Sequence, residues 1–236
     1  MRASRILAIT LAGTVVITLL FFGSWQVQRL FWKDGLIEIM AARSAAPPMP
    51  LAEVLALPVD EQEWTPVFAS GRLLPDASFA LYRIGANGRP GYHILTPLVL
   101  EDGSAVLINR GMMDAESFKL ALATMPGVPE QTVDVTGILR PGETPAFFTN
   151  DNDPDNEVWY WIELDLLADR AGVGLLPGVI YADADPAGAD LRSGQARFDP
   201  PNRHLQYAIT WYCLAAAAGV VFFLRLRRKP GGEKEI

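Results

Sequence analysis

The chain has 236 residues, 50% of them apolar, and a formal net charge of −7, which allows one ordinary domain or one domain with membrane segments. Its single cysteine excludes an internal disulfide, a zinc ribbon, a paired-cysteine copper site and a c-type haem attachment, and its two histidines are too few for a three-histidine metal site. The acidic balance argues against bulk binding of nucleic acid, which requires a basic surface.

Two uncharged apolar stretches predict transmembrane helices. They cover residues 6–22 and 207–224, that is 17 and 18 residues, and as helices they would span about 25–27 Å, close to the hydrocarbon core of a bilayer. Aromatic residues at their ends suit the membrane interface: Trp25, Tyr207, Trp211 and Tyr212.

The distribution of charge predicts the orientation of these helices. Residues 1–22 and 207–236 together carry a net charge of +5, whereas residues 23–206 carry −12. The positive-inside rule places the N-terminus (residues 1–5) and the basic tail (residues 225–236) in the cytoplasm, and residues 23–206 on the outer side. Because apolarity begins at residue 6, there is no room for an organelle presequence, and we expect a two-pass protein of the bacterial inner membrane with a periplasmic domain.

Each apolar stretch has an alternative interpretation. The first resembles a cleaved signal peptide, although the bulky sequence after Phe21 offers no small-x-small cleavage site. The second has the small residues of a helix-packing face, including Ala215 and Gly219, and is also compatible with a buried core helix. The Arg225–Lys229 cluster directly after it favours a stop-transfer segment.

The middle of the chain begins with helix and continues with strands. Loosely helical spacing over residues 24–42 predicts that the first membrane helix continues outward, and Pro50 starts a short helix over residues 51–57. A second short helix is predicted over residues 165–171, closed by Gly172. The β-prone runs cover residues 64–73, 78–84, 92–100, 105–109, 132–139, 158–164 and 178–184.

These elements predict a membrane-anchored α+β protein. Two transmembrane helices flank a mainly β extramembrane domain, which is barrel-like or a strongly bent sheet with short helices. The clearest hairpin lies between Leu100 and Ala105, through Asp102-Gly103.

The sequence has no G-x-S-x-G elbow, phosphate-binding glycine loop or H-E-x-x-H motif, so we predict that the protein is not an enzyme.

Cys213 lies in the middle of a predicted membrane helix, where we interpret it as a packing residue. The acidic loop at residues 150–157 begins like a calcium loop, but Asn156 replaces the required glycine and Ile162 the final glutamate. A solvated turn with Asx hydrogen bonds is the preferred interpretation.

The residues at the outer membrane interface suggest a binding site. His204, Tyr207 and Trp211 share one face of a continuous helix, so His204 would stand where the helix meets water. A neutral imidazole there can coordinate the iron of a flat, apolar macrocycle. Cationic and aromatic neighbours suit anionic groups and ring stacking: Arg203, Arg29, Lys33, Trp25 and Trp32.

The alternative is structural. His204 would then cap the start of the helix, and the aromatic and cationic residues would be ordinary interfacial anchors. His93 is predicted to be a strand residue with a satisfied hydrogen bond.

Four stretches give the chain a specific resemblance to a known family, the surfeit locus proteins, which are cytochrome c oxidase assembly factors. Their order between two membrane helices carries the match: Gly23-Ser24-Trp25-Gln26-Val27-Gln28-Arg29-Leu30-Phe31-Trp32-Lys33; Gly91-Tyr92-His93-Ile94-Leu95-Thr96-Pro97-Leu98 with Val106-Leu107-Ile108-Asn109-Arg110-Gly111; Asn152-Asp153-Pro154 with Asn156 and Trp159-Tyr160; and Asn202-Arg203-His204-Leu205-Gln206-Tyr207-Ala208-Ile209-Thr210-Trp211.

The resemblance implies a role in the biogenesis of haem-copper oxidase, by insertion of haem a into the catalytic subunit. His204 matches the family's proposed haem ligand, Trp211 matches a further family position, and the glycine-rich strand motif maps onto Gly91 and Arg110-Gly111. The chain departs from the family where Met112-Met113-Asp114 replaces Trp-Val-Pro, and where Arg203 stands in place of a common Asn.

We therefore expect a non-catalytic assembly factor that carries haem a as cargo. Its predicted haem-binding residues are His204 as the iron ligand with Arg203, Tyr207, Trp211, Trp25 and Arg29. Its predicted partners are the oxidase catalytic subunit, haem a synthase and the lipid bilayer, with no nucleic acid. The main alternative is a haem-independent scaffold that stabilises early oxidase intermediates, and a remoter one is an enzyme using Asp151, Asp153 or Glu163.

Overall fold

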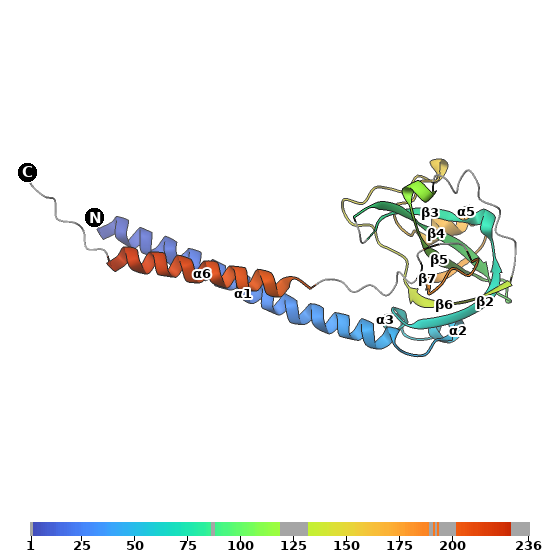
Figure 1. Ribbon diagram of the computed structural model, residues 1–236, viewed down its shortest axis with the longest axis horizontal. Coiled ribbons are helices and arrows are strands. Elements are labelled where there is room, and N and C mark those ends of the chain that lie inside the picture. Colours follow the sequence, from blue (N-terminus) through green and yellow to red (C-terminus); the bar gives the residue numbers. More distant parts are fainter. Residues whose placement is uncertain are drawn as a thin grey trace, which may run out of the picture. The chain divides into compact units, whose positions relative to one another are not determined.

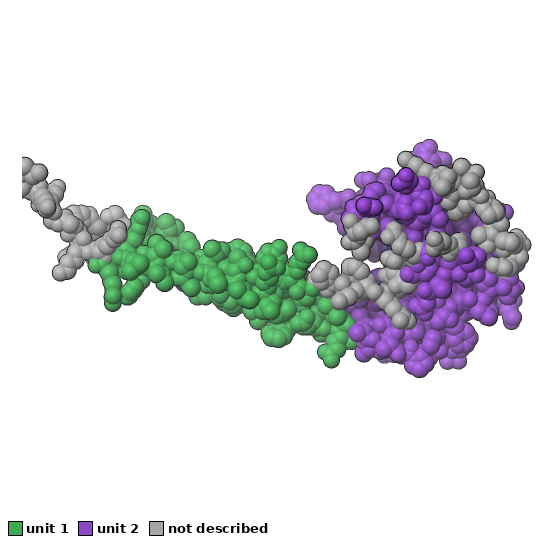
Figure 2. All heavy atoms as spheres, in the orientation of Figure 1, with its two compact units in different colours: residues 1–39, 199–236 green, residues 40–198 purple. Residues whose placement is uncertain are grey.

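The computed structural model describes residues 2–85, 88–118, 132–188, 191, 193 and 202–227. The chain divides into two compact units, which Figure 2 colours separately: residues 1–39 with 199–236, and residues 40–198. The first unit is helical and the second is built on a β-sheet, and each is described by itself below.

The helical unit consists of two antiparallel helices, α1 (Arg2–Ser44, of which residues 40–44 belong to the second unit) and α6 (His204–Arg227) (Figure 1). Both are long and apolar enough to cross a membrane, and only 6% and 11% of their most apolar windows are buried. Such exposure argues against a soluble core helix. The candidate span Ile6–Ser44 is about 58 Å long, twice the hydrocarbon thickness, so the predicted outward continuation of the first helix is confirmed.

A glycine sets the close approach of the two helices. A Cβ at Gly23 would lie 2.8 Å from the ring of Tyr212, so only glycine leaves room for the tyrosine in this position. The Tyr212 hydroxyl lies 3.1 Å from the Ser24 hydroxyl, and the rings of Phe22 and Trp211 pack at 5.1 Å. Small residues at helix crossings serve the same purpose in membrane proteins generally.

The second unit contains a mixed seven-stranded sheet in the order β1-β2-β6-β7-β5-β4-β3. An additional antiparallel pairing of β2 with β4, at Arg72–Val99 and Leu73–Leu98, bends the sheet into a ring (Figure 1). It is not a regular barrel, because β1 and β3 stay outside the closed path. The predicted fold class is confirmed. The strands are β1 (Met49–Pro50), β2 (Pro66–Leu73), β3 (Phe79–Ile84), β4 (Pro90–Val99), β5 (Ala105–Asp114), β6 (Thr132–Arg140) and β7 (Leu175–Ala182).

Two apolar clusters cover opposite faces of the sheet. Side chains alternate along β5, so Val106 and Ile108 enter one cluster while Leu107 enters the other. Short helix α2 (Leu51–Leu55) closes the first cluster through Leu51, and α5 (Leu164–Ala171) closes the second through Leu167. The remaining short elements are α3 (Val59–Gln62), η1 (Pro75–Ala77) and η2 (Pro154–Asn156).

Several local predictions are confirmed. The hairpin between β4 and β5 turns through Gly103 at φ +84°, with Leu100 N–H donating to the Ser104 carbonyl. Gly172 ends α5 in the left-handed conformation. In the acidic loop, the carboxylate of Asp153 accepts from the backbone N–H and the side-chain amide of Asn156, which is an Asx turn.

The strand predicted at residues 158–164 is wrong. The segment makes only isolated bridges, such as Leu81 with Trp159. The amide oxygen of Asn152 accepts from the backbone N–H groups of Tyr160 and Trp161, so a side chain takes the donors that a strand would use. The β-prone residues serve as core instead, since Trp159 and Ile162 are buried. The sequence also missed β1 and α3, and it ended β5 five residues too early.

Candidate functional site

Asn202, which lies two residues before the start of α6, forms hydrogen bonds with α1 beyond the predicted apolar stretch. The side-chain amide of Asn202 donates to the carboxylate of Asp34 at 2.7 Å and to the carbonyl of Leu30 at 3.2 Å. Its amide oxygen accepts from the backbone N–H of His204 at 3.3 Å. Asn202 therefore caps α6, which leaves the His204 ring for another contact.

The ring of His204 contacts α1. Its Nδ1 lies 2.7 Å from Oε1 of Gln26, which is four residues, or about 6 Å along the helix, after Phe22, the last residue of the predicted apolar stretch. An amide oxygen only accepts, so in the neutral imidazole this contact favours the tautomer with the proton on Nδ1 and the lone pair on Nε2. A side-chain partner on the second nitrogen is how proteins orient a histidine for metal ligation.

An aromatic and cationic cluster lies on the adjacent face of α1. Trp25, Arg29 and Trp32 recur at helical spacing, and the guanidinium carbon of Arg29 lies 4.5 Å from the Trp32 ring centroid and 6.0 Å from that of Trp25. Both tryptophans are exposed, at 43% and 58%. They present flat apolar surface beside a fixed positive charge.

Some of the predicted site residues therefore contact one another in the structure, whereas others contact residues that were not predicted. Trp25 joins Arg29, whereas His204 contacts Gln26 and Trp211 packs on Phe22. Arg203 and Tyr207 are exposed near the start of α6. Sequence reasoning missed Gln26 and Asn202 as functional residues, although both lie within the stretches quoted for the family resemblance.

A groove of the helical unit lies near the other end of the two helices. Its volume is about 1090 Å³, and it is lined by apolar residues such as Ala12, Leu19 and Phe222, with Arg225 and Arg227 at one end. No histidine, methionine, tyrosine or cysteine is among its described lining residues, so it offers no ligand for haem iron. The predicted iron ligand, His204, is not among the residues that line this groove.

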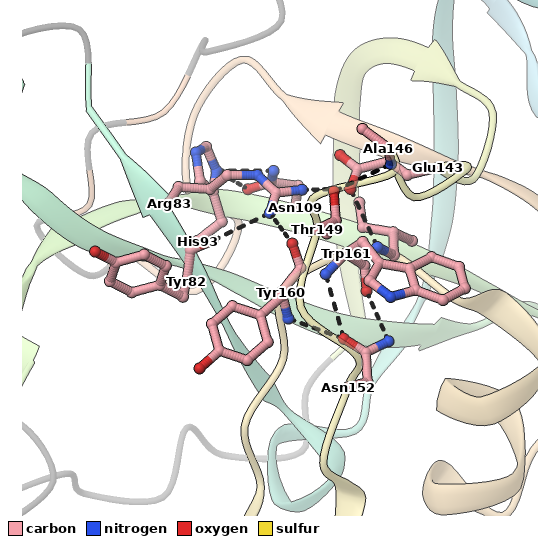
Figure 3. A network of polar contacts seen from close by, with 11 residues as sticks. Tyr82, Arg83, His93, Asn109, Glu143, Ala146, Thr149, Asn152, Tyr160 and Trp161 are labelled. Atoms are coloured by element: carbon pink, nitrogen blue, oxygen red, sulfur yellow. Dashed lines mark hydrogen bonds and ion pairs between the residues drawn. The ribbon is translucent and has the colours of Figure 1, made fainter.

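The sheet unit holds a polar pocket of about 390 Å³. One wall is organised by Glu143, whose carboxylate binds the guanidinium of Arg83 and accepts from the backbone N–H of Ile162 (Figure 3). Arg83 also donates to the carbonyl of Tyr160. Both charges of this ion pair are therefore satisfied within the wall.

A histidine lies beside this wall. His93 Nδ1 lies 2.9 Å from the amide nitrogen and 3.1 Å from the amide oxygen of Asn109 (Figure 3). The same oxygen accepts from the backbone N–H of Gly111. Burial lowers the pKa of His93 below its ordinary value of 6.5, and burial raises the pKa of the neighbouring Tyr181. The predicted role of His93 as a hydrogen-bonded strand residue is confirmed.

Two donors at the pocket have no partner among the described residues. They are Nε of Arg140 and Nε1 of Trp161, and both atoms are buried. An unpaired buried donor costs about 1–3 kcal/mol, so we expect a water, an ion or a ligand to satisfy it. Sequence reasoning identified neither residue, because a strand-end arginine and a loop tryptophan carry no motif.

The carboxylates considered for an enzyme are not gathered in either pocket described above. Asp153 is engaged in the Asx turn, and Glu163 accepts from the side-chain amide of Asn152. Asp151 is exposed in the same loop. Among the described residues, no three His, Cys, Asp or Glu side chains come together as a metal site.

The chain is similar to known proteins over most of its length. It is 33% identical to surfeit locus protein 1 of Rattus norvegicus over 89% of this chain and 72% of the relative, and 32% identical to that of Xenopus tropicalis over 88% and 72%. It is also 32% identical to a SURF1-like protein of Monosiga brevicollis over 89% and 83%. The sequence model of the SURF1 family matches residues 13–216, which include α1 from Gly13 onward, the whole sheet and the first half of α6. The chain therefore belongs to the SURF1 family.

Proposed function

We propose that the protein is an assembly factor for haem-copper cytochrome c oxidase, which binds haem a at the membrane interface and assists its insertion into the catalytic subunit. Family membership supports the assembly role. The single observation that supports haem binding is the contact of His204 Nδ1 with Gln26, because it orients the ring and, in the neutral imidazole, favours the tautomer in which Nε2 can bind iron.

The residues that neighbour Gln26 on α1 suit a cargo that must be released. Arg29 supplies one cation for an anionic propionate, and Trp25 and Trp32 supply flat apolar surface. A single histidine ligand with few polar anchors gives weaker binding than an enclosed pocket with two axial ligands. That weakness favours transfer to the catalytic subunit, and haem a synthase is the proposed source of the cargo.

We further propose that both termini lie in the cytoplasm and that the sheet unit lies in the periplasm of a bacterium. Basic residues lie at the end of each apolar stretch that is nearest a chain terminus, which supports this orientation. A C-terminal green fluorescent protein fusion would then fluoresce, whereas a periplasmic C-terminus exported through the general secretion route would leave it dark.

An absorption spectrum tests the haem proposal. Protein purified from cells that make haem a should show a Soret band, and His204→Ala should lose it while its circular dichroism stays unchanged. His93→Gln is the matched control, because it alters the other histidine of the chain, and it should keep the band. A band retained in His204→Ala would exclude this ligand.

The alternative is a scaffold that holds early oxidase intermediates without touching haem. One observation favours it. Phe147 and Phe148 are 94% and 90% exposed at a loop tip, with their rings in edge contact at 4.9 Å, and exposed aromatic pairs are typical of protein interfaces. A scaffold would be colourless in every haem background and would still co-purify with the catalytic subunit.

A further inference from the structure

We propose that the polar pocket of the sheet unit binds a carboxylate group through Arg140 and Trp161. The proposal concerns the unit formed by residues 40–198 and does not depend on haem binding at His204. It adds to the protein a second ligand site, of different chemistry.

The first argument is the pair of buried donors without partners. Nε of Arg140 and Nε1 of Trp161 belong to two residues that line the same pocket. Both groups donate only, so the missing partner must accept. One carboxylate has two oxygens and can accept from both donors.

The second argument is the way in which Arg140 is held. Its guanidinium carbon lies 4.1 Å from the ring centroid of Trp64 and 5.7 Å from that of Tyr181, so the cation is fixed by stacking. Its ion pair is a long one, at 3.5 Å from Nη2 to Glu63. Arg83 differs, because Glu143 and the Tyr160 carbonyl already satisfy it.

The third argument is the charge and size of the pocket. Its charged lining residues are Arg83, Arg140 and Glu143, so positive charges exceed negative ones by one within the lining, while Glu63, which pairs with Arg140 at 3.5 Å, does not line the pocket. That balance suits a singly charged anion better than a phosphate dianion or a metal cation. Thr144, Thr149 and Tyr181 add hydroxyl groups, and burial keeps the Tyr181 phenol protonated by raising its pKa.

The fourth argument concerns access. The two unpaired N–H groups are buried, so a ligand can reach them only if part of the lining moves, and the lining includes residues of the segment from Pro141 to Thr149. This segment contains no helix or strand, and its turn is closed by the contacts of Ala146 with Thr149. Its residues 144–149 can move without breaking a strand ladder, whereas Glu143 is held by Arg83 and Ile162.

The indole signals of the full chain test the proposal. Protein in detergent micelles, labelled with ¹⁵N at its six tryptophans and free of haem, is titrated with acetate or with neutral acetamide. The Trp161 indole signal, assigned through Trp161→Phe, should shift and saturate with acetate and not with acetamide. An unmoved Trp161 signal, or equal shifts with both compounds, would overturn the proposal.

Variants of Arg140 test which cation is used. Arg140→Gln should weaken acetate binding by about tenfold or more, because it removes a charge-assisted hydrogen bond. The matched control is Arg170→Gln, which alters an exposed arginine of α5 and should bind acetate as the wild type does. If the indole signals of Arg140→Gln are no longer dispersed, that variant is unfolded. Arg140→Lys then tests the same point with the charge retained. Wild-type affinity in a folded Arg140 variant would overturn the assignment.

Two peptides distinguish the source of the carboxylate. Acetyl-Ala-Glu-Ala-amide that binds more tightly than acetate would identify an acidic side chain of a polypeptide partner as the ligand, and equal affinity would identify a small carboxylic acid. The same peptide with Gln in place of Glu should not bind, and binding by it would contradict a carboxylate site. Because no haem is present, these results are independent of the proposed function.

Discussion

Nδ1 of His204 lies 2.7 Å from Oε1 of Gln26, so the histidine at the start of α6 is oriented by a side chain of α1. The contact joins residues 178 positions apart in the sequence. It makes the orientation of the imidazole depend on the other helix, and with it the direction in which Nε2 could meet iron.

Replacing Gln26 by Leu should therefore weaken haem a binding. Loss of such an outer partner typically reduces metal affinity by about 10–100-fold, because the ring loses its orientation and its fixed tautomer. Titration of the purified chain with haem a, followed at the Soret band, measures the change.

The chain offers two matched variants for this test. Gln26→Glu keeps an acceptor for Nδ1 and should bind haem a at least as well as the wild type. Gln28→Leu alters an exposed glutamine of the same helix and should leave the affinity unchanged. Equal losses in Gln26→Leu and Gln28→Leu would refute an orienting role.

Gly23→Leu should separate the two membrane helices. A side chain there meets the Tyr212 ring, since even a Cβ would lie 2.8 Å from it, and overpacking of this kind costs about 1–3 kcal/mol. The thermal unfolding temperature in detergent should fall, and haem binding should weaken because Gln26 moves away from His204. Gly13→Leu is the control, because a Cβ there meets nothing within 4 Å. A similar fall in both variants would show that the close approach is not important.

Much of the fold was predictable because it follows from apolar patterning. The two uncharged stretches predict α1 and α6, and alternation with Gly and Pro punctuation locates six of the seven strands within a few residues. The ring closure was not predictable in detail, since the pairing of β2 with β4 depends on contacts between distant residues. The strand prediction around Trp159 was wrong because β-propensity does not account for the side chain of Asn152, whose amide oxygen accepts from the backbone N–H of Tyr160.

The candidate site was predictable only in part. His204 follows from its place before an apolar helix, whereas its partner Gln26 is an ordinary polar residue on another helix. Arg140 and Trp161 carry no sequence signal, because an unpaired donor is a property of the folded environment.

Asp185→Ala should destabilise the sheet unit strongly. The carboxylate of Asp185 binds the guanidinium of Arg110 at 2.7 and 3.0 Å, and the side chains are only 2% and 4% exposed. Removal of one partner leaves a buried charge uncompensated, which costs about 3–5 kcal/mol. Denaturant unfolding of the full chain, monitored by circular dichroism, measures the loss.

The control for this prediction is Asp165→Ala, which alters an exposed carboxylate in the first turn of α5 and should cost far less. The double variant Arg110→Leu/Asp185→Leu should recover part of the stability lost in Asp185→Ala, because it removes both buried charges. If Asp185→Ala unfolded at the same denaturant concentration as the wild type, the ion pair would have no structural role.

The sheet unit should lose stability as the pH falls below 6.5, the ordinary pKa of histidine. Burial lowers the pKa of His93 in the folded protein, so below pH 6.5 the unfolded chain binds a proton that the folded chain does not. The unfolding free energy therefore decreases as the pH falls from 6.5 to the lower folded pKa, and above pH 6.5 His93 contributes no slope.

Denaturant unfolding of wild type and His93→Gln at several pH values isolates this contribution. His93→Gln should have a shallower slope in that range, and His204→Gln should keep the slope of the sheet unit, because His204 belongs to the helical unit. Identical slopes in wild type and His93→Gln would mean that His93 takes up its proton equally in both states.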